Sequence, residues 1–139
     1  DVIARAREKA FGDFDRPCYG VALRMTKVEL MAIENVPALG EKEPDLYFKL
    51  RDSMGRMLFE ADEADDGLQA VWEAKDLNEP LPGIAGGTIE VWDDDFNGDD
   101  PLGKPVVFQL DFKPNEYEIT TELGCPDFTI SITWEKLHE

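Results

Sequence analysis

Residue types that most catalytic and zinc sites require are scarce in this sequence. It contains one histidine, His138, and two cysteines, Cys18 and Cys125. A Ser-His-Asp or Cys-His arrangement needs a well-placed histidine, and zinc needs several histidine or cysteine ligands. No glycine-rich phosphate loop opens a helix. The sequence therefore predicts that the protein is not an enzyme, and a carboxylate pair for sugar hydrolysis is the one catalytic alternative left open.

Basic residues and long apolar runs are also missing. The chain carries 14 Lys and Arg against 31 Asp and Glu, a formal net charge of −17. Nucleic acids and anionic membranes both attract basic surfaces, so we expect no nucleic-acid partner and no unaided membrane binding. No apolar run approaches the length of a transmembrane helix. A bound divalent metal would change the local sign of the charge.

The length and composition indicate one globular domain. The chain has 139 residues, of which 42% are hydrophobic, enough for a sizeable core. Residues 1–20 are predicted to be an N-terminal extension, helical or irregular, and residues 21–139 the domain. The start at Asp1 suggests a mature product or part of a larger protein. Cys18 and Cys125 either form a disulfide or remain thiols; the compartment is unknown, with an extracytoplasmic one slightly favoured.

Alternating apolar residues after residue 20 predict an all-β domain, an eight-stranded antiparallel β-sandwich. A change of phase near Thr26 suggests a bulge or a bend. The sequence SMGR, 53–56, is predicted to be a hairpin turn, and EPLPGIAGG, 79–87, a loop. The expected strands lie within residues 21–36, 45–52, 57–62, 68–77, 88–93, 104–112, 115–120 and 127–137.

The stretch DDDFNGDD, residues 93–100, is crowded with aspartates between two expected strands. Calcium takes six to eight oxygen ligands. Asp93 and Asp95 can point toward one cation, and Asp100 can return to it after Gly98, which allows a sharp turn. The spacing also matches the start of an EF-hand loop. However, Lys104 stands where that loop needs Glu, and the flanks are predicted strands, so only a local loop of that geometry stays open.

The same stretch resembles a known family. EVWDDDFNGDDPLGKPVVFQL, residues 90–110, resembles the third calcium loop of C2 domains, the module of protein kinase C and synaptotagmins, through Asp93, Asp95, Asp100 and Gly103. EPDLYFKL resembles the family's S-D-P-Y-V-K-V segment, which places Asp45 at the ligand position of loop one. LQAVWEA is similar to N-P-V-W-N-E, and ISITW to the last strand. The resemblance covers about residues 27–134.

The resemblance implies a function as well as a fold. In C2 domains, loops one and three hold one to three calcium ions, which recruit phospholipid headgroups or a protein. Gly40 follows VPAL where the family usually has Asp, so Glu41 or Glu43 would have to substitute, and a second calcium ion is in doubt. Phe96 and Ile84 are candidate membrane or partner contacts. The expected calcium ligands are Asp45, Asp93, Asp95 and Asp100, with Asp99 and Glu41 as further candidates.

Two alternatives remain at this stage. The acidic run can be a hydrated loop in an acidic protein. A calcium-stabilised sandwich of a secreted protein, binding carbohydrate or serving a structural or adhesive role, would also fit. Sugar-binding sandwiches use exposed aromatic side chains. Trp72 and Trp134 are expected in the core, whereas Trp92 is predicted to be exposed or to lie under the calcium loop.

Overall fold

The computed structural model describes residues 22–33, 44–64, 67–94 and 98–137. The expected extension over residues 1–20 and Cys18 lie outside these ranges, so neither the domain boundary nor the disulfide is tested. Cys125 is half-buried. Nine strands are present: β1 (Leu23–Ala32), β2 (Leu46–Asp52), β3 (Met57–Glu60), β4 (Gln69–Glu73), β5 (Gly86–Asp93), β6 (Asp100–Pro101), β7 (Val106–Gln109), β8 (Glu118–Cys125) and β9 (Phe128–Lys136).

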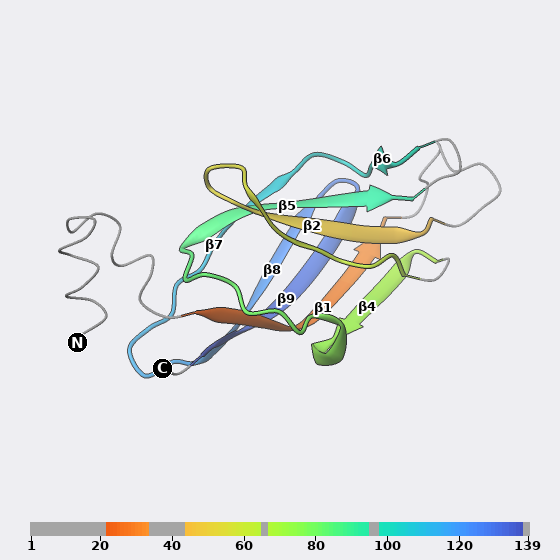
Figure 1. Cartoon of the computed structure of the whole chain (residues 1–139). Coiled ribbons are helices and arrows are strands. Elements are labelled where there is room, and N and C mark those ends of the chain that lie inside the picture. The colour runs from red at the N-terminus through yellow and green to blue at the C-terminus, as the bar shows by residue number, and fades with distance from the viewer. Residues whose placement is uncertain (1–21, 34–43, 65–66, 95–97, 138–139) are drawn as a thin grey trace.

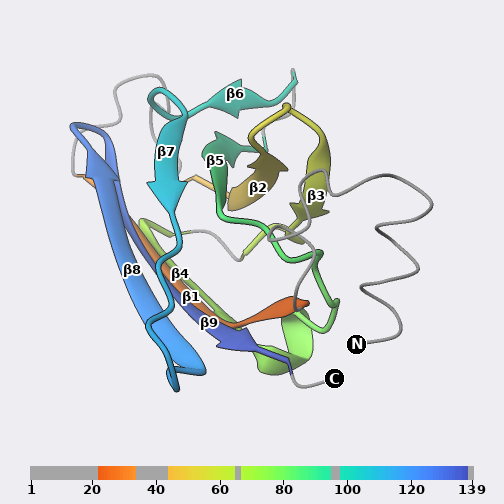
Figure 2. The ribbon, with the colours of Figure 1, turned by 90° about the vertical axis from the view of Figure 1, so that its left-hand side faces the viewer.

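The strands form two antiparallel sheets packed face to face (Figures 1 and 2). One sheet has the order β4-β1-β9-β8, and the other has β3-β2-β5, with β6 and β7 pairing to the same edge of β5. The predicted all-β sandwich is confirmed. The count is nine rather than eight because the edge strand beyond β5 is interrupted, and its first piece, β6, has only two residues.

The predicted irregularity in the first strand is present as a bulge. Met25 pairs with Trp134 and Lys27 with Thr133, so Thr26 is an extra residue in β1. The Thr26 hydroxyl donates to the Thr133 carbonyl at 3.4 Å. The bulge resets the alternation so that the apolar residues on both sides of it face the core.

Several predicted strand boundaries were wrong; for example, β7 covers residues 106–109 rather than 104–112. The strand expected over 68–77 stops at Glu73 and continues as a 3₁₀ helix, η3 (Ala74–Asp76), because the Asp76 carboxylate accepts from the Glu73 N–H. β8 runs to Cys125, five residues beyond Thr120. β5 begins at Gly86 rather than Thr88. A Cβ at Gly87 would lie 2.0 Å from the Arg51 carbonyl, so only glycine permits this close strand pairing.

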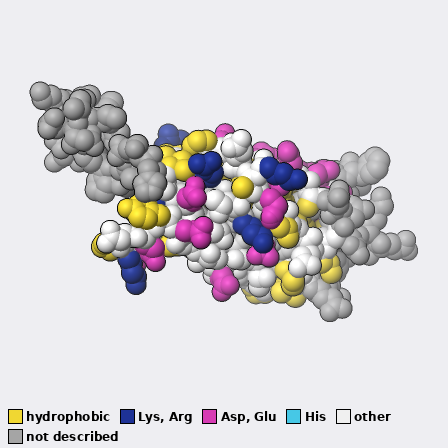
Figure 3. Space-filling view, turned by 90° about the horizontal axis from the view of Figure 1, so that it is seen from below, with side chains coloured by type: hydrophobic (Ala, Val, Ile, Leu, Met, Phe, Trp, Pro, Cys, Tyr) yellow, Lys and Arg dark blue, Asp and Glu magenta, His cyan; other side chains and the backbone are white. Residues whose placement is uncertain are grey.

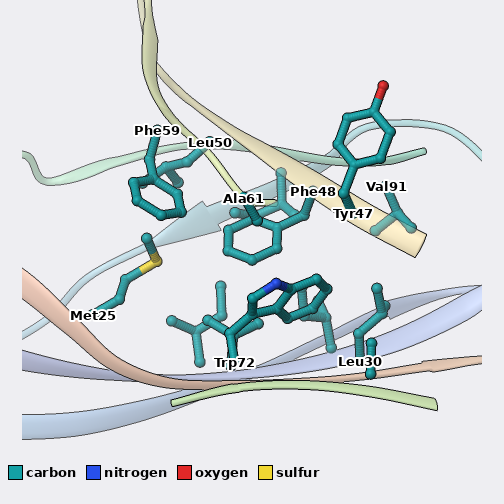
Figure 4. Packing of buried hydrophobic residues seen from close by; sticks show 14 of the residues in the cluster. Met25, Leu30, Tyr47, Phe48, Leu50, Phe59, Ala61, Trp72 and Val91 are labelled. Atoms are coloured by element: carbon teal, nitrogen blue, oxygen red, sulfur yellow. The ribbon is translucent and has the colours of Figure 1, made fainter. Parts of the chain in front are cut away.

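The core between the sheets is built around aromatic side chains (Figure 4). Phe48 lies edge-on to Trp72 with ring centroids 4.9 Å apart, and Phe108 stacks on Trp134 at 5.4 Å. The Trp72 indole N–H donates to the Asp62 carbonyl, so its polar atom is satisfied within the core. Trp72 and Trp134 are both buried, as predicted.

The sandwich has two different ends. β1 and β5 end, and β2 and β4 begin, at what we call the loop end, on the right in Figure 1. The β2–β3 turn and residues 81–85 lie at the opposite end, which we call the hairpin end. The predicted turn over 53–56 is confirmed there, with Gly55 at φ 88°. Within the described ranges, no helix is long and apolar enough to cross a bilayer.

Candidate functional site

Asp93 is a buried acid at the loop end. It closes β5, in which every second residue from Gly87 to Asp93 is buried, and it is only 5% exposed. It therefore continues the core-facing side of β5, at the mouth of the space between the sheets. Burial of a carboxylate is costly unless it is hydrogen-bonded or paired with a cation. An acid that was only part of a hydrated surface loop would not need to be buried in this way.

Asp45 is held directly beside Asp93. Its backbone N–H donates to Asp93 Oδ1 at 3.0 Å, and its carbonyl accepts from the Asp94 N–H at 3.0 Å. These two bonds continue the contact between β2 and β5 beyond the residue at which β2 begins. They bring the predicted ligand of loop one next to the predicted ligands of loop three, although 48 positions separate the two residues along the chain.

Asp100 faces Asp93 across the strand pairing. β5 and β6 are antiparallel, and Asp93 and Asp100 are Cα partners in that register. Directly opposed residues project on the same side of a sheet, with Cβ atoms about 5 Å apart. Like charges in such a pair are destabilising. A divalent cation between the two carboxylates would remove that cost.

Asp99, the neighbour of Asp100, is engaged elsewhere. Its carboxylate accepts a hydrogen bond from the Tyr47 hydroxyl. Tyr47 points away from the core (Figure 4), on the outer side of the β3-β2-β5 sheet. Burial raises the pKa of Tyr47, and the hydrogen bond to Asp99 and its charge raise it further. The phenol is therefore a neutral donor at physiological pH.

The remaining predicted site residues are placed as follows. Asp95, Phe96 and Glu41 lie outside the described residues. Ile84 precedes β5, whereas Asp93 ends it, so Ile84 lies at the hairpin end and not on a loop neighbouring the acidic run. Its half-buried side chain packs against the core, which leaves no reason to place it in a contact with the loop end.

The described carboxylates do not form a metal site by themselves. Among the described residues, no group of three His, Cys, Asp or Glu side chains is close enough to hold a metal ion. The facing pair Asp93 and Asp100, with Asp45 beside it, offers only oxygen donors, which calcium prefers. The sequence-based prediction adds Asp95 and Glu41, neither of which is described.

Exposed apolar side chains at the same end were not predicted. Met31, near the end of β1, is 47% exposed, and Ile33, directly after β1, is 43% exposed. Met31 projects from the outer face of the β4-β1-β9-β8 sheet, as does Val71 on β4. Figure 3 views this face and shows Lys and Arg interspersed with Asp, Glu and hydrophobic side chains. We call Met31 and Ile33 the apolar rim; in the sequence they belong to the expected first strand, 21–36, and nothing there marks them as exposed.

Trp92 is a half-buried residue on the outer side of β5. The ammonium of Lys49 lies 4.3 Å from its ring centroid, and its indole N–H donates to Glu90 Oε1 at 3.0 Å. Glu90 is also paired with Arg51 at 2.8 Å. One ring face is therefore covered by a cation, which does not give the open platform that sugar stacking requires.

Comparisons with known proteins agree with this architecture. The chain is similar to a solved structure titled "Structure of a C2 domain", with a TM-score of 0.60 and 16% sequence identity. The match covers 85% of this chain and 99% of the other. No protein-family model matches, and no curated protein matches in sequence. The chain thus has a C2-like fold with a divergent sequence.

Proposed function

We propose that this protein is a non-catalytic calcium-binding module that docks on a phospholipid membrane or a protein partner through its loop end. The observation that carries the proposal is the pairing of Asp93 with Asp100, with Asp45 held against Asp93. Asp93 and Asp100 would hold the ion, with Asp45, Asp95 and Glu41 completing the shell. Bound calcium would supply a positive centre for an anionic group.

The charge of the molecule explains why docking would depend on the ion. At −17, the protein repels anionic lipid, and the described loop end adds Asp62 and Glu63 to the carboxylates of the site. Divalent ions are the largest local charges in such sites and reverse the local potential. The exposed Met31 and Ile33 would then contact the apolar part of the partner surface.

The test is calcium-dependent sedimentation with vesicles of phosphatidylcholine and phosphatidylserine. We expect the protein to pellet with the vesicles in calcium and to stay in the supernatant in EGTA. Asp100→Asn should abolish pelleting. Asp111→Asn, which removes an exposed acid near the hairpin end, is the matched control and should pellet as wild type does. Met31→Ser with Ile33→Ser should weaken pelleting but leave calcium binding intact.

The result also separates the two kinds of partner. Calcium binding without pelleting would direct the proposal to a protein partner. If wild type binds no calcium at all, the proposed function is wrong. The carbohydrate-binding alternative has less support, because Trp72 and Trp134 are buried and Lys49 lies over Trp92.

A further inference from the structure

The hydrogen bond between Tyr47 and Asp99 joins two distant parts of the chain. Tyr47 lies on β2 and Asp99 just before β6, 52 positions later. Tyr47 is 5% exposed, so its hydroxyl needs a protein partner. We call residues 98–102, which lead from the acidic stretch back to the sheet, the returning limb. The contact connects this limb to β2, which pairs with β5 in the middle of the sheet.

The side chains of Asp99 and Asp100 project on opposite sides of that sheet. Tyr47 pairs with Trp92 and projects outward, whereas Asp100 pairs with Asp93 and projects on the core-facing side. Asp99, bonded to Tyr47, is thus directed to the outer side. The Asp99 carboxylate is therefore directed away from an ion held between Asp93 and Asp100.

The returning limb is fixed at both of its ends. At one end Asp99 is bonded to Tyr47; at the other, the buried Leu102 donates its N–H to the Val91 carbonyl at 2.7 Å. Gly98 at φ 118° begins the limb and Gly103 at φ 73° follows it, both with backbone conformations that other residues rarely adopt. Between the two anchors lies Asp100, facing the like charge of Asp93.

We propose that Asp99 is a positioning residue rather than a calcium ligand: its bond to Tyr47 holds the returning limb so that Asp100 stays opposite Asp93. Without this anchor, the repulsion between the two facing carboxylates would move the limb away from β5. The assignment to calcium rests on the proposed function, whereas the anchoring itself does not.

Anchoring is tested by a double-mutant cycle in EGTA, with no calcium present. Tyr47→Phe and Asp99→Ala each remove one partner of the hydrogen bond. Each should lower the melting temperature by about 4 °C, as expected for losing a charge-assisted hydrogen bond in a domain of this size. The double variant should melt no lower than the less stable single variant. Additive losses would overturn the anchor.

The ligand assignment is tested by calcium titration calorimetry. Asp99→Asn keeps an acceptor for Tyr47 and should leave the Kd within about threefold of wild type, because an amide oxygen can still hold the limb. Asp100→Asn should raise the Kd roughly tenfold or more, equal to about 1.4 kcal/mol or above. An equal loss in Asp99→Asn and Asp100→Asn would show that Asp99 is a ligand. If wild type binds no calcium, the proposed function fails, while the cycle in EGTA still decides the anchor.

Discussion

The two ends of the sandwich each contain a buried aspartate, and the two acids have different surroundings. In the described part of the chain, Asp52 and Asp93 are the only buried charged residues, at 8% and 5% exposure. They lie on neighbouring strands, with Asp52 ending β2 at the hairpin end and Asp93 ending β5 at the loop end. The two acids are similarly buried, so burial alone does not distinguish their roles.

Asp52 is satisfied by its own turn. Its Oδ1 accepts from the N–H groups of Met54 and Arg56 at 2.9 Å, and its Oδ2 accepts from Arg56 Nε at 3.0 Å. Burial alone would raise the pKa of Asp52, but the hydrogen bonds from Arg56 and Met54 outweigh it and hold that pKa below its usual value. At the hairpin end, the positive charge beside the buried acid is thus the side chain of Arg56.

Asp93 instead faces a second carboxylate, that of Asp100, across the β5–β6 pairing. The comparison teaches that two acids of similar burial can have different surroundings: Asp52 is held by turn amides and an arginine, whereas Asp93 accepts the Asp45 N–H and also faces another acid. The first arrangement stabilises the fold; under the proposed function, the second would hold the calcium ion. The predictions below separate these two roles.

The largest expected effect is the stabilisation of the protein by calcium. At a free calcium concentration about 100 times the Kd, binding to the folded state alone adds about 2.7 kcal/mol to the free energy of unfolding. Urea denaturation in calcium and in EGTA measures this gain. We expect it to vanish in Asp93→Asn with Asp100→Asn and to persist in Asp52→Ala. A gain that survives in the double variant would place the ion elsewhere.

The next effect is the loss of stability in Asp52→Ala. Removing the acceptor of two turn amides should lower the free energy of unfolding by about 2 kcal/mol, with or without calcium. Arg56→Ala is the matched control. Because the Arg56 side chain is 78% exposed, its loss should cost only about 0.5 kcal/mol. Equal losses in the two variants would contradict the view that the backbone bonds dominate.

The contribution of Asp52 should also depend on pH. Its pKa is lower in the folded state than in the unfolded state, where it is about 3.9. The stabilisation is therefore fully present above the unfolded pKa and is lost as pH falls through the folded pKa. The stability difference between wild type and Asp52→Ala should be constant near neutral pH and shrink in acid. If the difference instead grows on acidification, the pKa of Asp52 is raised, not lowered, in the folded state.

The smallest effect is expected for Asp100→Asn in EGTA. Removing one of two facing like charges should stabilise the protein by about 0.5 kcal/mol when no calcium is present. In calcium, the same variant should be less stable than wild type, because the gain from binding is lost. Such a change of sign would not occur for Asp52→Ala, whose loss should be the same in both conditions.

Much of this fold follows from local sequence patterns. The alternation of Phe128, Ile130, Ile132 and Trp134 predicts β9, and the change of phase at Thr26 predicts the bulge. Features that depend on partner strands were missed. β6 is two residues long and includes Pro101, so only its pairing with β5 defines it as a strand.

The candidate site, too, was predicted from the sequence only in part. The spacing of Asp93 and Asp100 along one loop suggests that they approach each other, and the family resemblance adds Asp45 from a distant segment. The contact of Tyr47 with Asp99 had no local signal, because it depends on the register of β2 against β5 and β5 against β6. The apolar rim at Met31 and Ile33 was missed because exposed and buried apolar residues look alike in sequence.

The most direct test of the central claim is calcium titration calorimetry of wild type beside Asp93→Asn and Asp52→Asn at neutral pH. We predict that wild type and Asp52→Asn bind calcium with the same Kd, and that Asp93→Asn binds at least roughly tenfold more weakly, a difference of about 1.4 kcal/mol. Absence of binding to the wild-type protein, or equal affinities in all three proteins, would contradict the claim that the loop end is a calcium site.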